Sequence, residues 1–161
     1  MAALEIKIDV LAPEHKKVLE FSGYKPTRFL KIIPSLMKET MRLSSSKFFE
    51  DKIKWDVSAE DIVFYGEWRG KDEKDGRTTL WVSIKAQGSQ NKNEKNGKIM
   101  IELRGEMKTK FKYSNILDKA LYLTYSRLFY SDLRRRYATE AVRDITTIEN
   151  ELKKELEAMV K

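Results

Sequence analysis

The side chains best suited to chemistry in this sequence are its arginines, its aromatic residues and one histidine. The densest basic cluster is Arg134-Arg135-Arg136, with Arg127 about two helical turns earlier. Arginine presents a planar fork of donors that matches phosphate, so this cluster is typical of a polyanion site. Acidic residues within helical reach leave a second interpretation open, in which the cluster is a solvated face of ion pairs.

A second basic strip follows a predicted strand, where Arg104, Lys108 and Lys110 share the outer face. We expect this strip to join the arginine cluster if folding gathers both on one surface. The net charge of +7 is otherwise spread along the chain, since residues 1–46 and 47–114 each carry +3 and residues 115–161 carry +1. The candidate residues for nucleic acid are therefore Arg104, Lys108, Lys110, Arg127, Arg134, Arg135 and Arg136.

Large aromatic side chains recur on two strand-like segments, at Trp55, Phe64 and Trp68. With Leu121 and Tyr125 of a predicted helix, they are candidates to line a cavity for a small apolar molecule. Aromatic residues on the inner face of a sheet also form ordinary core, and that interpretation stays open beside the pocket.

No residue pattern predicts catalysis, a metal site or a cofactor. His15 is the only histidine, and no partner is evident near it in the sequence. Asp51 is expected to point outward, and Trp81 has the parity of the outer sheet face. Glycine-rich phosphate loops, nucleophile elbows and paired histidine or cysteine ligands are absent. We therefore favour a binding protein over an enzyme.

Size and composition favour one folded domain over residues 1–161. Apolar residues make up 41% and charged residues 35%, as in a globular protein with a charged surface. The absence of cysteine excludes disulfides and thiolate metal sites. No secretory signal and no apolar run long enough to span a bilayer is visible, so we expect a cytoplasmic protein that is a monomer or homodimer.

Residue alternation predicts an antiparallel sheet. A first strand covers residues 4–10, and four further strands centre on 49–57, 62–68, 80–86 and 99–111, with polar turns between them. Residues 14–20 are expected to form a short helix. Apolar spacing predicts another helix over 26–43, kinked or divided near Pro34.

From Ser114 onward the apolar period becomes helical and continues almost to the end of the chain. A continuous helix of about 46 residues would be roughly 69 Å long, whereas the body of such a domain is about 40 Å across. We therefore expect either a break at Ser131-Asp132 or a projecting helical end over residues 138–161. That end has heptad-like apolar positions at Val142, Ile145, Leu152, Leu156 and Met159, so it is a candidate interaction helix.

These elements predict an α+β fold, a curved antiparallel sheet packed against a long C-terminal helix. The strand at Leu4–Leu11 followed by Pro13, the helical region 26–43 and the helix 114–160 resemble the helix-grip fold of the START and Bet v 1-like superfamily. The resemblance rests on element order and implies a cavity between sheet and helix. It favours non-catalytic binding of an apolar or amphipathic small molecule. Two alternatives remain, a nucleic-acid-associated protein and a protein-interaction module that docks through the C-terminal helix.

Overall fold

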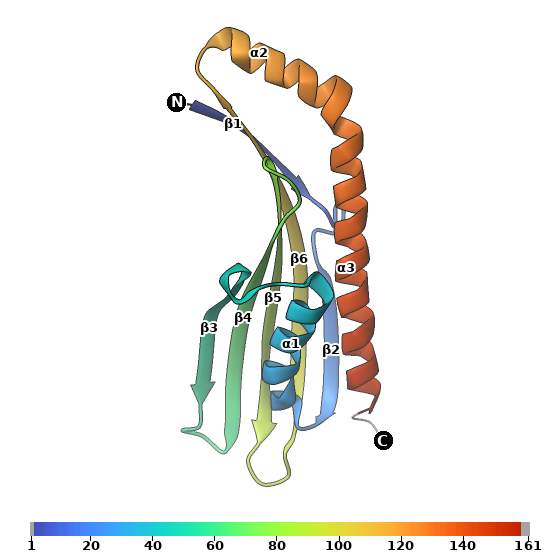
Figure 1. Ribbon diagram of the computed structural model, residues 1–161. Helices are drawn as coiled ribbons and strands as arrows, with labels where there is room; N and C mark the ends of the chain where they lie inside the picture. Colours follow the sequence, from blue (N-terminus) through green and yellow to red (C-terminus); the bar gives the residue numbers. More distant parts are fainter. Residues whose placement is uncertain (1, 159–161) are drawn as a thin grey trace.

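The computed structural model describes residues 2–158 and has the predicted α+β architecture, six antiparallel strands with three α-helices. Helices α1 and α3 lie against one face of the sheet, and α2 crosses the end of the molecule (Figure 1). The elements in chain order are β1 (Ala2–Asp9), β2 (Lys17–Tyr24), α1 (Phe29–Met41), β3 (Phe48–Asp56), β4 (Asp61–Glu73), β5 (Thr78–Asn91), β6 (Asn96–Tyr113), α2 (Ile116–Tyr125) and α3 (Ser131–Ala158).

The strand order is β1-β6-β5-β4-β3, with β2 beside β1 along the same edge of β6. Residue Leu4 of β1 pairs with Phe111, and Leu19 of β2 pairs with Ile101. The short helix predicted over residues 14–20 is therefore wrong. The first half of β6 offers an open edge there, and pairing with it buries Leu19 in the core.

The two faces of the sheet differ as the alternation predicts. On β5, Leu80, Val82, Ile84 and Ala86 are fully buried on the inner face, where α1 and α3 pack. Residues of the opposite parity lie on the outer face, which no helix covers in Figure 1. Apolar side chains from the strands, α1 and α3 form one core cluster, which is where the hydrophobic effect stabilises the fold.

Helix α1 runs without interruption through Pro34, and a 3₁₀ turn at Pro26–Arg28 precedes it. The prediction of two short helices joined at Pro34 is therefore wrong. The helix buries Phe29, Ile33 and Met37, whose spacing of four residues places them on one side. Burial of this stripe against the sheet outweighs the one backbone donor that proline removes.

The long C-terminal helix is interrupted directly before the predicted position, by a π-helical turn at Ser126–Tyr130. Helix α2 therefore leaves the line of α3 and crosses the end of the sheet (Figure 1). Helix α3 buries Ile145, Leu152 and Leu156 in the core. These heptad positions of the candidate interaction helix are thus occupied within the chain, while Met159, with the rest of 159–161, lies outside the described residues.

Candidate functional site

The five predicted pocket residues are spread along the sheet, with Trp68 in its middle, level with Ile84 and Leu103. Trp55 pairs with Phe64, and their rings are 6.3 Å apart between centroids. Phe64 pairs with Gly88 of β5, which in turn pairs with Ile99 of β6. Tyr125 instead contacts Phe111, much further along β6. Twelve residues of extended strand separate these two levels, a distance of about 40 Å. The five side chains therefore do not line one cavity.

Exposure separates the five residues further. Trp68 and Phe64 are buried, with 0% and 1% of their surfaces exposed, while Trp55 is 49% exposed on the edge strand β3. Leu121 and Tyr125 are also exposed, because α2 has no buried residue. Trp68 and Phe64 thus belong to the core, the interpretation left open from the sequence.

Close packing fills the space beneath the helices. A Cβ atom at Gly66 would lie 2.3 Å from the ring of Trp68, so the indole occupies the room that this glycine leaves. At Gly105 an added Cβ would lie 2.4 Å from Val10 and 2.7 Å from Ile145 of α3. The inner face of β4 and β6 is therefore in direct contact with neighbouring side chains at these positions.

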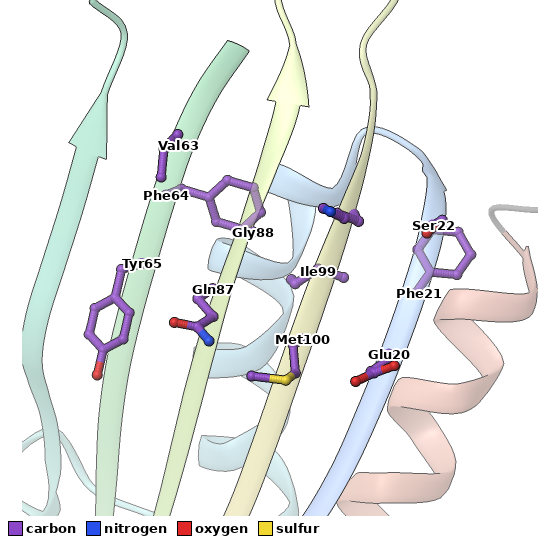
Figure 2. A pocket seen from close by; sticks show the side chains of 11 residues that line it. Glu20, Phe21, Ser22, Val63, Phe64, Tyr65, Gln87, Gly88, Ile99 and Met100 are labelled. Carbon is purple, nitrogen blue, oxygen red and sulfur yellow. The ribbon is translucent and has the colours of Figure 1, made fainter. Parts of the chain in front are cut away.

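A groove lies on the outer face of the sheet and has a volume of about 580 Å³. It crosses β4, β5, β6 and β2, and Figure 2 shows its lining side chains on these four strands. Strand register places Tyr65, Gln87, Met100 and Glu20 in one cross-strand row. Val63, Lys98 and Ser22 lie in the next row of the same parity, and the row between them contributes Phe64, Gly88, Ile99 and Phe21.

The groove has an apolar side and a charged side. Val63 is 54% exposed on β4, next to the ring of Tyr65, whose hydroxyl donates to Glu67 at 3.1 Å. Burial, followed by this hydrogen bond, raises the pKa of Tyr65. Lys98 and Glu20 lie on β6 and β2, and no side chain in the described part of the chain pairs with either charge. Both are therefore available to a bound molecule.

The predicted polyanion residues are divided by the sheet. Arg104 donates to Glu102 at 2.6 Å and Lys108 pairs with Glu106 at 3.5 Å, both on β6, and Lys110 lies opposite Glu5 of β1 in the strand register. Arg127, Arg134, Arg135 and Arg136 belong instead to the π-helical turn and the start of α3. The strand residues are on the outer face and the arginines are on helices that pack against the inner face.

The other singled-out residues are on the surface. Asp51 points outward at a bulge of β3 and accepts two hydrogen bonds from Arg69, at 2.5 and 3.1 Å. Arg69 also lies over the ring of Trp81, 5.0 Å from its centroid, which partly covers this outer-face tryptophan. His15 is exposed, with Nδ1 2.7 Å from the carboxylate of Asp9, a partner that the sequence did not indicate.

A buried polar network joins the β4–β5 turn to the C-terminal helices. Tyr130 and Tyr137 both donate to Asp75, and the hydroxyls of Tyr130 and Thr78 are 2.6 Å apart. Burial would raise the pKa of Asp75, but hydrogen bonds from Tyr130, from the backbone and from Tyr137 outweigh it and lower that pKa. Burial, with the carboxylate next in importance, raises the pKa of Tyr130 to about 12.

The described residues contain no group of three or more histidine, aspartate or glutamate side chains placed to hold a metal ion. No helix within residues 2–158 is long and apolar enough to cross a bilayer. The arrangement on the outer face can bind a molecule, and the polar network around Asp75 ties three elements together.

Sequence reasoning named Phe64, but for a cavity between sheet and helix, and missed the other groove residues. Glu20, Gln87, Lys98 and Met100 come from different strands and resemble any other surface residues in the sequence. For β5 and β6, the alternation in the sequence does predict that Gln87, Lys98 and Met100 lie on the outer face. The strand register that makes them neighbours, and β2 itself, are set by pairing between distant segments.

Comparison with known proteins finds no matching family model and no matching curated protein. Among solved structures, a protein of unknown function from Staphylococcus aureus is 11% identical, with a TM-score of 0.29 over 94% of this chain and 97% of the other. An uncharacterised protein from Rhizobium leguminosarum is 7% identical, with a TM-score of 0.25 over 96% and 99% of the two chains. At these TM-scores neither likeness supports an inference.

Proposed function

We propose that this protein is a non-catalytic binding protein for an amphipathic small molecule, held in the outer-face groove. The observation that carries the proposal is the groove of about 580 Å³, apolar at one end and charged at the other. This volume falls in the range of small-molecule sites. The proposal keeps the ligand class that the helix-grip resemblance implies, and it keeps the expected cytoplasmic location. It moves the site from the interior to the outer face.

The groove favours a molecule with an apolar body and an ionised end. Val63 and the ring of Tyr65 provide apolar contact on β4, and Met100 provides it at the centre. Lys98 offers an ammonium group to an anionic end, with Gln87 and Ser22 as neutral hydrogen-bonding groups beside it. The site contains no nucleophile activated by a neighbouring base, so binding rather than reaction is the function that its chemistry supports.

The test uses 8-anilinonaphthalene-1-sulfonate, an anionic and amphipathic dye, as the probe. We expect its fluorescence to rise on binding, and Lys98→Glu to weaken binding by about threefold to tenfold, since charge reversal turns an attraction into a repulsion. Met100→Ala should weaken binding as well, because it removes apolar contact. Fluorescence titration measures both changes.

Two variants control for dye bound elsewhere. Lys31→Glu makes the same charge change at an exposed position of α1, and Leu121→Glu removes apolar surface from α2. Lys31→Glu should bind the dye as the parent does, and Leu121→Glu should retain the dye bound in the groove. The proposal is overturned if Lys98→Glu and Lys31→Glu have equal affinity, or if Leu121→Glu alone abolishes the signal. Native mass spectrometry of the purified protein would report any ligand that it retains.

A further inference from the structure

Helix α2 presents an apolar face to solvent. Tyr122 on its inner side stacks on Phe111 of β6, with 5.2 Å between the ring centroids, and this contact holds the helix against the sheet. The side away from the sheet carries Leu117 and Leu121, which are four residues apart, and Leu128 follows in the π-helical turn. The exposed fractions are 86% for Ile116, 75% for Leu117, 67% for Leu121 and 67% for Leu128.

An apolar stripe of this kind is unusual on a folded protein. Contiguous exposed apolar patches mark contacts with another protein, a ligand or a membrane, because water is excluded from them only when they are covered. Helix α2, which carries this stripe, lies across one end of the molecule, between the end of β6 and the start of α3 (Figure 1). Residues 116–130 would extend about 22 Å as a helix, and both of their ends are held by the fold.

The chain segment that contains α2 is rich in positive charge. Residues 108–136 contain eight lysine or arginine residues and two aspartates, a net charge of +6. On β6, Lys108 pairs with Glu106 and Lys110 lies opposite Glu5, and Asp132 lies 3.7 Å from Arg135. The positive charge around α2 therefore comes chiefly from Lys112, Lys119, Arg127, Arg134 and Arg136.

From the exposed apolar face and this charge, we propose that the α2 end docks on an anionic lipid bilayer, with the leucine stripe among the headgroups. Apolar helices flanked by lysine and arginine lie in the membrane interface, and each basic residue near an anionic surface adds attraction. A second copy of the chain would bring two positively charged ends together. Nucleic acid would match the charge but leave the leucines in water.

Arginine 134 adds a contact suited to an anionic headgroup. Its Nε is buried, and no described residue accepts a hydrogen bond from it. It lines a hollow of about 320 Å³ with Arg135, Ser131, Ile8 and Ala138, between β1 and the start of α3. A phosphate or carboxylate oxygen in this hollow would provide the acceptor, with apolar surface beside it.

The test is sedimentation of the full chain with vesicles of phosphatidylcholine, with and without phosphatidylserine. We expect binding to the anionic vesicles, little binding to the neutral ones, and release as salt is raised. The triple variant Leu117→Ser, Leu121→Ser, Leu128→Ser should reduce the bound fraction about tenfold or more, since it removes the apolar contact. Lys119→Glu with Arg127→Glu should do the same by removing attraction.

Matched variants separate this proposal from its competitors. Val142→Ser changes an exposed apolar residue of α3, 37% exposed, and should leave vesicle binding unchanged. Equal binding to neutral and anionic vesicles, or none to either, overturns the proposal. A dimer in solution that the leucine variant dissociates, or binding of a short single-stranded DNA without vesicle binding, also overturns it. Dye binding by the leucine variant reports on the outer-face groove separately, so the two proposals fail independently.

Discussion

Tyr130 shows how a single buried side chain connects distant parts of the chain. Only 3% of its surface is exposed, and its hydroxyl donates to Asp75 in the β4–β5 turn. The pKa of Asp75 is lowered in the folded chain, so its contribution to stability is present above the unfolded pKa and is lost as pH falls from there through the lower, folded pKa. The pKa of Tyr130 is raised to about 12, so its contribution is lost as pH rises from about 10 to 12.

We predict that Tyr130→Phe lowers the free energy of unfolding by about 1–3 kcal/mol at neutral pH, because the partly buried carboxylate of Asp75 loses a donor. The decline in stability between about pH 10 and 12 should become shallower, since the titrating hydroxyl is gone. Urea unfolding at a series of pH values measures both effects.

Tyr24→Phe is the control, because Tyr24 is 47% exposed. Its stability should follow the parent protein at every pH. Identical pH profiles for the parent and for Tyr130→Phe would contradict the role assigned to the buried hydroxyl.

At the scale of elements, the approach of α3 to the sheet depends on a missing side chain. Gly105 lies in the middle of β6, and Ile145 of α3 and Val10 press against it from the inner side. A larger residue there would push apart two branched side chains in the core. Element order alone does not reveal this contact, because it joins positions 40 residues apart in the sequence.

We predict that Gly105→Ala lowers the free energy of unfolding by about 1–3 kcal/mol, since the core cannot absorb the added methyl group without moving α3. Gly76→Ala is the matched control, because an added Cβ there meets no atom within 4 Å. It should change stability by less than about 0.5 kcal/mol. Denaturant midpoints compare the two, and equal midpoints would show that α3 does not rest on Gly105.

At the scale of the whole molecule, helix α3 is part of the core rather than an appendage. Ile145, Ile148 and Leu152 have 0% exposure and pack in the same cluster as the inner face of the sheet. A long helix docked in this way makes sheet and helix depend on each other. The molecule should therefore unfold as one unit, as small single domains usually do.

We predict that Ile148→Asp destabilises the protein by about 4 kcal/mol or more, because it buries a carboxylate without a partner. Tryptophan fluorescence and the helical circular dichroism signal should be lost in the same transition. Val142→Asp, on an exposed position of the same helix, should remain folded. A sheet signal that survives the loss of α3 in Ile148→Asp would show that the helix is dispensable.

The candidate sites were less predictable than the fold. The charge sums of residues 47–114 and 115–161 do not reveal the net charge of +6 over residues 108–136, because that segment spans their boundary. Helical spacing predicts an apolar face that includes Leu121, but spacing does not say what covers that face. The turn at Ser126–Tyr130 directs α2 away from the line of α3, and this leaves the leucines exposed.

The sequence by itself determined the elements with a strong local period. These are the alternation of β5 and β6 and the helical spacing of α3, because a side chain's direction follows from its own backbone. Only the tertiary structure decided that residues 17–24 form a strand on β6, that the outer groove joins four strands, and that the leucines at α2 stay exposed. Those features depend on contacts between distant segments, which no local pattern encodes.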